Sequence, residues 1–332
     1  MKKRRKIALV TGGAGFIGSH MVDLLLSKGF SVRIIDNLTG GHKKNLKHCI
    51  KNKKIKFRNF DICKLKPNDN FFKQVSYVFH FAGIGDIVPS IENPDRYMLN
   101  NVQGTIKVLE ASRYNNIKKF VYAASASCYG KTKGLTNENQ KISIEHPYGL
   151  SKYLGEKAVM HWNKVYKLPA NSLRIFNAYG PRVRTTGAYG AVIGVFLKQK
   201  IKKKPLTIVG NGKQSRDFVY VSDVAKAFFA ASTTKISGQI YNVGTGKPET
   251  VNTLAKLVGG NKTFIPDRPG EPRVSKADIR KIKKELKWKP TVKFKDGINI
   301  LLKLINNWRD APLWTPKKIK KATKLWFNFL SK

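Results

Sequence analysis

Short apolar runs alternate with amphipathic stretches through the first half of the chain. The runs lie at residues 6–11, 31–36, 55–62, 77–82, 120–125 and 172–176. Continuous apolar runs of this length predict strands that are buried on both faces. Apolar residues at helical spacing in 16–28, 94–114 and 148–167 predict helices between the strands. This alternation predicts crossover units and a doubly wound α/β fold with a parallel sheet.

The pattern changes after about residue 177, where loops lengthen and glycine and proline become denser. We therefore expect one domain over residues 1–176, to which 218–240 return, and a smaller mixed α/β substrate domain over 177–332. The last stretch, 314–330, is basic and amphipathic. Its apolar residues at helical spacing are Ile319, Ala322, Trp326, Phe329 and Leu330. A membrane-surface helix is one interpretation, but we favour a terminal helix that docks its apolar stripe on its own core.

The charge is strongly positive, with 64 Lys and Arg against 20 Asp and Glu and a formal net charge of +44. Such a charge can indicate a nucleic-acid or membrane-surface partner. The lysines are scattered through nearly every predicted helix and loop, and no nucleic-acid-binding motif accompanies them. We therefore favour a general lysine bias on a solvated surface, and expect no specific nucleic-acid partner.

Cysteine usage and the N-terminal pattern indicate an intracellular setting. Cys49, Cys63 and Cys128 are odd in number and lack metal-ligand spacing, which predicts reduced thiols and no metal site. The basic start is followed by only four apolar residues, 7–10, too few for a signal peptide. No segment approaches the length of a membrane span. We expect a cytoplasmic protein.

A glycine series marks the candidate cofactor site. Gly12, Gly15 and Gly18 follow the first strand and open the first helix. This arrangement permits a tight turn, a close approach of the backbone to a pyrophosphate, and close helix–strand packing. Asp36 ends the second strand, where a carboxylate accepts from ribose hydroxyls and repels a 2′-phosphate, so NAD is favoured over NADP. Lys43 and Lys44, which follow a few residues later, keep NADP as an alternative. Asp61, at the end of the third predicted strand, fits equally well as an adenine ligand and as an ordinary turn former.

A Tyr-x-x-x-Lys spacing carries the candidate chemistry. Tyr148 and Lys152 lie one helical turn apart on a predicted helix. A free phenol has a pKa near ~10. We expect the ammonium and a nicotinamide cation to lower it, so that Tyr148 accepts a proton from a substrate hydroxyl. Ser125, at the carboxyl end of a strand, is placed to hold the substrate oxygen. Ser127 is its rival for that role.

Together with Thr11–Gly18, these motifs resemble the extended short-chain dehydrogenase/reductases of the NAD-dependent sugar-nucleotide epimerase/dehydratase family. The resemblance also rests on Arg174–Pro181 and Arg216–Phe218, and covers nearly the whole chain. It implies a Rossmann-type NAD-binding domain. The cofactor residues that it implies are Gly12, Gly15, Phe16, Ile17, Gly18, Asp36, Asn37, Asp61, Ile62, Phe81, Ala82, Gly83, Asn101, Tyr148 and Lys152. The substrate residues are Ser125, Ser127, Tyr148, Asn177, Gly190, Ala191, Val192, Arg216, Arg268 and Ser275, with the two arginines clamping phosphates.

The resemblance also bears on the reaction. Residues 126–129 contain no acid, whereas the family's dehydratases carry an Asp-Glu pair there. This favours 4-epimerisation of a UDP-sugar through a transient 4-keto intermediate. Ser275 stands where glucose-restricted members have a bulky tyrosine, which leaves room for a 2-acetamido group. Gly85 departs from a lysine found in some hexose epimerases.

Alternatives remain at this point. Plain hexoses and N-acetylated hexoses both fit the motifs, and Arg273 would suit a uronate. A UDP-glucuronate 4-epimerase or decarboxylase is therefore the second hypothesis for an enzyme. The non-enzyme hypothesis is an NAD-sensing or nucleic-acid-binding regulator. Tyr148, Lys152 and Ser125 argue against a regulator, because a sensor has no use for a catalytic base. Helices 94–114 and 148–167 match those that form a four-helix dimer interface in the family, so we expect a homodimer.

Overall fold

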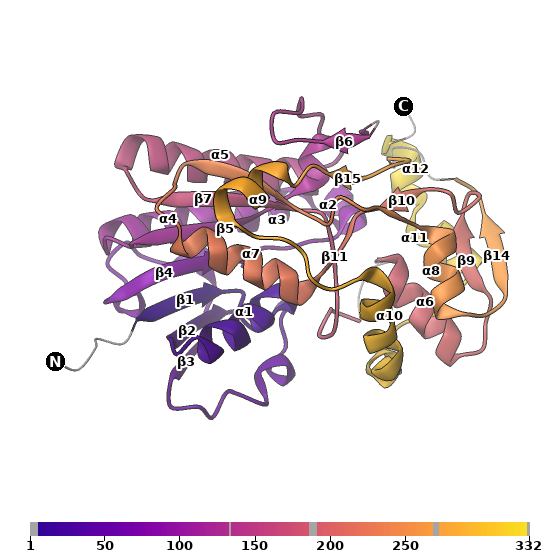
Figure 1. The fold of residues 1–332 in the computed structure, drawn as a ribbon, viewed down its shortest axis with the longest axis horizontal. Helices are drawn as coiled ribbons and strands as arrows, with labels where there is room; N and C mark the ends of the chain where they lie inside the picture. The colour runs from indigo at the N-terminus through magenta and orange to yellow at the C-terminus, as the bar shows by residue number, and fades with distance from the viewer. Residues whose placement is uncertain (1–5, 133, 186–190, 268–271, 331–332) are drawn as a thin grey trace.

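A single parallel sheet organises the larger part of the molecule (Figure 1). The computed structural model describes residues 6–132, 134–185, 191–267 and 272–330. The sheet has seven strands in the order β12-β7-β5-β4-β1-β2-β3. Their bounds are β1 Ile7–Thr11, β2 Ser31–Asp36, β3 Ile55–Asn59, β4 Val75–His80, β5 Lys119–Ser125, β7 Ala170–Ile175 and β12 Gln239–Val243. Every pairing in it is parallel, as the alternating pattern predicts.

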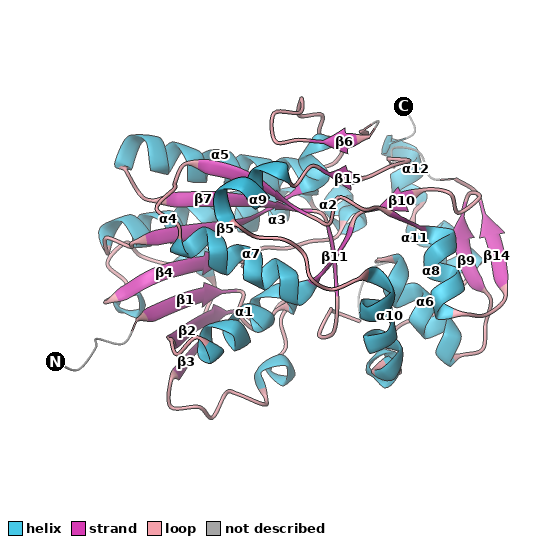
Figure 2. Ribbon diagram, viewed as in Figure 1, coloured by secondary structure: helices cyan, strands magenta, loops and turns pink. Residues whose placement is uncertain are grey.

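Helices cover both faces of this sheet (Figure 2). On one face Ala8 and Val10 pack with helices α1, α7 and α9. On the other, Leu9 packs with α4 and α5. The helix bounds are α1 Phe16–Ser27, α4 Gly104–Tyr114, α5 Pro147–Tyr166, α7 Val221–Thr233 and α9 Arg280–Leu286. Because successive residues of β1 are buried on opposite faces, the strand is apolar from Ile7 to Val10.

A smaller lobe has its own apolar core. Its sheets are two-stranded: β8 with β11, β9 with β14 and β10 with β13. A fourth pair, β6 with β15, adjoins the sheet domain, in whose core Ala277 packs. The strands span β6 Leu135–Thr136, β8 Asn177–Tyr179, β9 Leu206–Val209, β10 Ser215–Arg216, β11 Phe218–Tyr220, β13 Glu249–Thr250, β14 Lys262–Ile265 and β15 Lys276–Ala277. The helices are α6 Val192–Ile201, α8 Val251–Val258, α10 Phe294–Lys303, α11 Pro316–Ala322 and α12 Lys324–Leu330.

Four predicted elements differ in detail. The third strand ends at Asn59, and Ile62–Lys64 form a 3₁₀ turn. The single helix expected over 94–114 comprises α3 (Pro94–Met98), a π turn (Leu99–Gln103) and α4, preceded by α2 (Ile87–Glu92). Strand β11 pairs with β8 instead of joining the main sheet, which gains β12. The C-terminal stretch forms two helices that divide at Thr323, whose hydroxyl donates to the Ile319 carbonyl at 2.8 Å.

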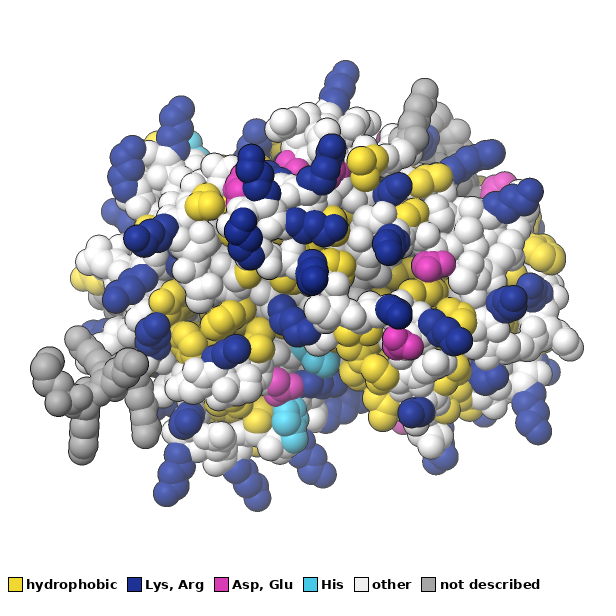
Figure 3. Space-filling view, in the orientation of Figure 1, with side chains coloured by type: hydrophobic (Ala, Val, Ile, Leu, Met, Phe, Trp, Pro, Cys, Tyr) yellow, Lys and Arg dark blue, Asp and Glu magenta, His cyan; other side chains and the backbone are white. Residues whose placement is uncertain are grey.

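Positive side chains are spread over the face seen in Figure 3, above both the sheet domain and the smaller lobe. This spread matches the expectation of a solvated lysine-rich surface. Among the described residues, no helix combines the length and apolar character that a membrane span requires.

Candidate functional site

The glycine loop packs too tightly for side chains. Gly12 has a φ of +68°, and a Cβ there would lie 2.7 Å from the Ala82 amide nitrogen. A Cβ at Gly18 would lie 2.1 Å from the Gly12 carbonyl oxygen. Helix α1 begins at Phe16, and in the described structure no side chain caps its first turn. The loop therefore presents the N-terminus of α1, with its amide groups and positive dipole end, to an anion.

Asp36 fastens this loop to the end of β2. Its carboxylate accepts hydrogen bonds from the amides of Ala14 at 2.9 Å and Leu38 at 2.8 Å. The residue is 6% exposed, and desolvation raises the pKa of its carboxyl group. A carboxylate has about four lone-pair sites, so those left over can accept from ribose hydroxyls.

Asp61 does what an ordinary turn former does. Its Oδ1 accepts from the Cys63 amide at 2.9 Å and caps the 3₁₀ turn of Ile62–Lys64. Asn37 reaches its other oxygen at 3.5 Å. Adenine recognition by Asp61 and Ile62 stays a prediction.

Asn101 joins the loop after β4 to helix α5. Its Oδ1 accepts from the Ile84 amide at 2.8 Å, and its Nδ2 donates to the Ile84 carbonyl at 3.0 Å and to Ser151 Oγ at 2.9 Å. A Cβ at Gly83 would lie 2.6 Å from Asn101 Oδ1 and 3.9 Å from Lys152 Nζ. The segment 81–83 is therefore held beside the predicted catalytic residues.

Tyr148 and Lys152 lie on one helix as their spacing predicts, and the end of a strand brings Ser125 to Tyr148. Helix α5 places Tyr148 and Lys152 one turn apart, and Ser125 at the end of β5 hydrogen-bonds to Tyr148. Ser125 Oγ also accepts from the Ser127 amide at 3.2 Å. Of the two serines, only Ser125 is thus in contact with Tyr148 among the bonds the structure describes. This arrangement can hold a hydroxyl oxygen beside a phenol.

Burial dominates the electrostatics of this pair. Desolvation raises the pKa of Tyr148, and its hydrogen bond with Ser125 acts in the opposite direction. Desolvation lowers the pKa of Lys152 to about 7. In the chain by itself the pKa of Tyr148 is raised because burial disfavours the charged phenolate. The lowering expected with NAD⁺ bound stays a prediction.

A cavity of about 460 Å³ opens beside Ser125 and runs into the smaller lobe. It is lined by seven predicted substrate residues: Ser125, Ser127, Asn177, Ala191, Val192, Arg216 and Ser275. The Arg216 guanidinium is steadied by the carbonyls of Ser215 at 3.0 Å and Pro272 at 2.7 Å. Gly190 and Arg268 lie outside the described residues.

Known proteins are similar to this chain in both architecture and sequence. A family model described as the NAD dependent epimerase/dehydratase family matches residues 8–244. The chain belongs to this family. A putative UDP-glucose 4-epimerase of Methanocaldococcus jannaschii is 41% identical over 309 residues, which cover 90% of this chain and 97% of the relative.

Two solved structures of the epimerase/dehydratase type superpose closely. One is the UDP-N-acetylglucosamine 4-epimerase of Methanobrevibacter ruminantium M1, with a TM-score of 0.86, 31% identity, and coverage of 92% of this chain and 99% of the other. The second is the Bacillus cereus UDP-glucuronic acid 4-epimerase with UDP-glucuronic acid and NAD. Its TM-score is 0.84, its identity is 31%, and 91% and 99% of the chains are covered.

NAD is the cofactor of this epimerase/dehydratase chain, and the site fits it. The uncapped N-terminus of α1 suits the diphosphate, and the glycine positions leave no room for a Cβ. The buried Asp36 carboxylate suits an unphosphorylated ribose, whereas a 2′-phosphate would meet its charge.

Several residues of this site escaped the sequence reasoning. Glu156 lies one turn beyond Lys152 and is held by Arg174 at 2.6 Å. The spacing 148, 152, 156 on one helix was the signal that could have found it. Asp86 and Glu145 also line the cavity. The family's dehydratase pattern places its acids only at 126–129, so it gives no signal for acids that other loops bring to the cavity.

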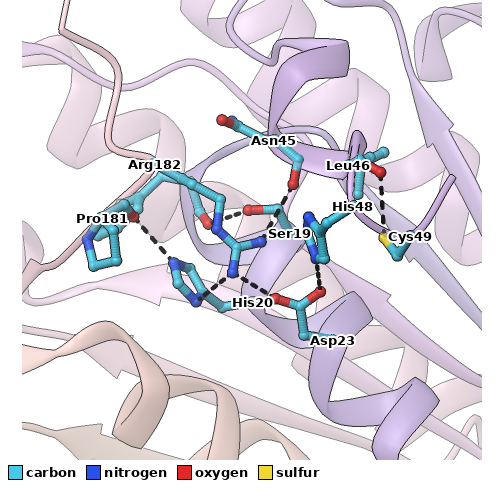
Figure 4. A network of polar contacts seen from close by, with 10 residues as sticks. Ser19, His20, Asp23, Asn45, Leu46, His48, Cys49, Pro181 and Arg182 are labelled. Atoms are coloured by element: carbon cyan, nitrogen blue, oxygen red, sulfur yellow. Dashed lines mark hydrogen bonds and ion pairs between the residues drawn. The ribbon is translucent and has the colours of Figure 1, made fainter. Parts of the chain in front are cut away.

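A network of polar contacts links helix α1 to Pro181 and Arg182, which follow strand β8 (Figure 4). Arg182 donates to Asp23 Oδ2 at 2.5 Å, to His20 Nδ1 at 3.1 Å and to the Asn45 carbonyl at 3.3 Å. Because arginine only donates, His20 Nδ1 is the acceptor, and its Nε2–H donates to the Pro181 carbonyl at 3.0 Å. Burial lowers the pKa of His20 to about 4, consistent with this neutral ring.

Asp23, His48 and Cys49 bring three potential metal-ligating atoms within 4.8 Å in the same network. The Asp23 carboxylate is already paired, by Arg182 and by His48 Nε2 at 2.7 Å. A guanidinium on the carboxylate opposes a second cation there, so the trio is accounted for as part of the ion-pair network.

Proposed function

We propose that the protein interconverts the C4 epimers of a UDP-sugar through a transient 4-keto sugar, with UDP-N-acetylglucosamine and UDP-N-acetylgalactosamine, UDP-glucose and UDP-galactose, or both pairs, as substrates. The observation that carries the proposal is a single cavity that is lined both by Ser125, which adjoins Tyr148, and by Arg216. Such a cavity suits a sugar whose reacting carbon lies near Tyr148 while its diphosphate lies near the guanidinium.

The chain's own residues supply proton transfer and orientation. Ser125 holds the C4 oxygen, and Tyr148 accepts the hydroxyl proton on oxidation and returns it on reduction. Lys152, one helical turn from Tyr148, supplies positive charge to the site and donates a hydrogen bond to a hydroxyl of the nicotinamide ribose. Bound NAD supplies the hydride acceptor and donor. Epimerisation then needs only that the keto sugar present its other face before reduction.

The N-acetylated sugars are favoured by Ser275. Its small side chain lines the cavity, where a larger one would take up space. Its amide donates to the Ser215 carbonyl at 3.1 Å, which keeps the position fixed. A pocket of this kind admits a 2-acetamido group.

A uronate is the second candidate. Arg184 lines the cavity together with Ser125, whereas Arg273, the residue that the sequence suggests for a uronate, is not among the described lining residues. Desolvation raises the pKa of Asp86, and the charge of Arg184 acts in the opposite direction, which places these two groups near each other. Arg184 is therefore the group available to a C6 carboxylate.

The test is a panel of UDP-glucose, UDP-N-acetylglucosamine and UDP-glucuronate, incubated without added NAD and resolved by product NMR. We expect the 4-epimer of at least one sugar. Tyr148→Phe should lower kcat by about 10²–10⁴-fold because the proton acceptor is lost. Tyr153→Phe, on the same helix, is the matched control and should keep full activity.

Other products would contradict the proposal. Carbon dioxide release from UDP-glucuronate would make the protein a decarboxylase, and a 4-keto-6-deoxy sugar would make it a dehydratase that uses Asp86 or Glu145. No turnover of any UDP-sugar would overturn the proposed activity altogether.

A further inference from the structure

The C-terminal segment, residues 312–330, lies across the substrate cavity. Trp314 and Trp326 both line the cavity, together with Pro312. Figure 1 shows α11 and α12 beside the smaller lobe, with α12 next to α2. Helix α12 packs against both α2 and α11. The segment lies beyond residue 244, where the match to the family model ends.

The start of the segment is anchored at the smaller lobe. Gln199 of α6 donates to the Trp314 carbonyl at 2.8 Å and to Thr207 Oγ1 at 2.7 Å. The Thr315 side chain caps α11 by accepting from the Lys318 amide. Ile319 and Thr323 are buried. The segment is therefore a packed part of the fold from its first residues.

The end of the segment lies at the sugar end of the cavity. Helix α2 begins at Ile87, directly after Asp86, and both residues line the cavity with Ser125. Asp86 lies near enough to Tyr148 for its charge to raise the pKa of that phenol. Because α12 packs on α2, which begins directly after Asp86, we place Trp326 in the part of the cavity that adjoins Asp86. Trp326 is 6% exposed, so its indole is largely enclosed.

We infer that residues 312–330 form the outer wall of the sugar subsite and that Trp326 determines which sugar substituents fit there. This inference rests on the proposed UDP-sugar function. An indole offers a large, rigid apolar face with few rotamers, which suits the C–H face of a pyranose. Walls of this kind discriminate by shape, and one methylene group in an apolar pocket typically changes kcat/KM by about 10–200-fold.

The experiment compares Trp326→Ala, Trp326→Phe and the matched control Phe329→Ala, on the same helix with its ring 64% exposed. For each full-length variant, kcat and KM are measured with UDP-glucose, UDP-N-acetylglucosamine and UDP-glucuronate, and Kd is measured for UDP alone. Thermal unfolding confirms that each variant is folded.

We expect Trp326→Ala to change the ratio of kcat/KM between the sugars by about 10-fold or more, towards the bulkier ones, with an unchanged Kd for UDP. Trp326→Phe keeps an aromatic wall and should give a smaller change. Phe329→Ala should match the wild type.

Unchanged sugar ratios in a folded Trp326→Ala variant would overturn the inference. So would an equal loss of affinity for UDP and for every UDP-sugar, because that would place the indole at the nucleotide. If the wild type turns over none of the sugars, the proposed function fails by itself. The ratio of Kd values for each UDP-sugar against UDP then still decides the role of Trp326.

Discussion

Lys152 is the most unusual charge in the site. It is 7% exposed, and its ammonium lies 4.4 Å from the centre of the Tyr122 ring. The carboxylate whose charge raises its pKa, Glu156, is already bound by Arg174 at 2.6 Å and by Ser172 at 3.0 Å. The lysine therefore shares its counter-charge with an arginine, which explains why burial dominates its pKa.

This lysine should make folding stability depend on pH. Its pKa falls from 10.5 in the unfolded chain to about 7 in the folded one. Between these values the unfolded state binds more protons, so the free energy of unfolding rises as the pH rises from 7 towards 10. Denaturant unfolding at pH 7 and pH 9 measures this rise. Lys152→Met should show a smaller rise than the wild type, and equal rises would contradict the assignment.

At the level of elements, the π turn of Leu99–Gln103 sets the position of Asn101. The Asn101 carbonyl accepts from Thr105 Oγ1 at 2.6 Å, while its buried side chain grips Ile84 and Ser151. A π turn widens a helix locally and often occurs at a functional site. Here it lets one amide side chain join the loop after β4 to the helix that carries Tyr148 and Lys152.

Asn101→Ala should cost about 1–3 kcal/mol of stability, because the Ile84 amide and carbonyl lose their partners in a partly buried place and buried Ser151 loses a donor. It should also lower kcat, since the loop that flanks Lys152 loses its tether. Chemical denaturation and steady-state kinetics measure the two effects. Asn100→Ala is the control: its side chain makes one bond, to the Arg96 carbonyl at 2.9 Å. Equal effects of the two variants would refute the tethering role.

At the scale of the whole molecule, helices α4 and α5 pack together and leave apolar side chains on the surface. The exposed ones in and around this pair are Leu99, Tyr114, Leu150, Leu154, Val165 and Tyr166. An apolar surface of this kind commonly marks an interface between protein chains. It supports the homodimer expected from the resemblance, in which two helices from each chain would meet.

We predict that the protein in solution has twice the mass of one chain, by light scattering. Leu154→Glu should convert it to a monomer, because Leu154 is 38% exposed on α5 and a buried unpaired carboxylate is costly. Leu304→Glu is the control, since Leu304 is 40% exposed at the end of α10. A monomeric wild type, or a dimeric Leu154→Glu variant, would contradict the prediction.

The sequence by itself determined what local pattern can encode. Continuous apolar runs predict doubly buried strands, and six of the observed strands lie within one or two residues of those runs at one end or both. Gly12, Gly15 and Gly18 required a close backbone approach, and the spacing of Tyr148 and Lys152 required one helical face. These features depend on residues that lie only a few positions apart, so the sequence alone is enough to predict them.

Tertiary structure decided what depends on residues far apart in the chain. It brings Asp86, Glu145 and Trp326 into one cavity with Ser125, and it joins Arg174 to Glu156. It also decides the pKa of Tyr148 in the chain by itself, which desolvation raises because residues from distant segments enclose the phenol. The sequence thus determined the chemical groups and their local spacing, whereas long-range packing decided their solvation and which of them meet.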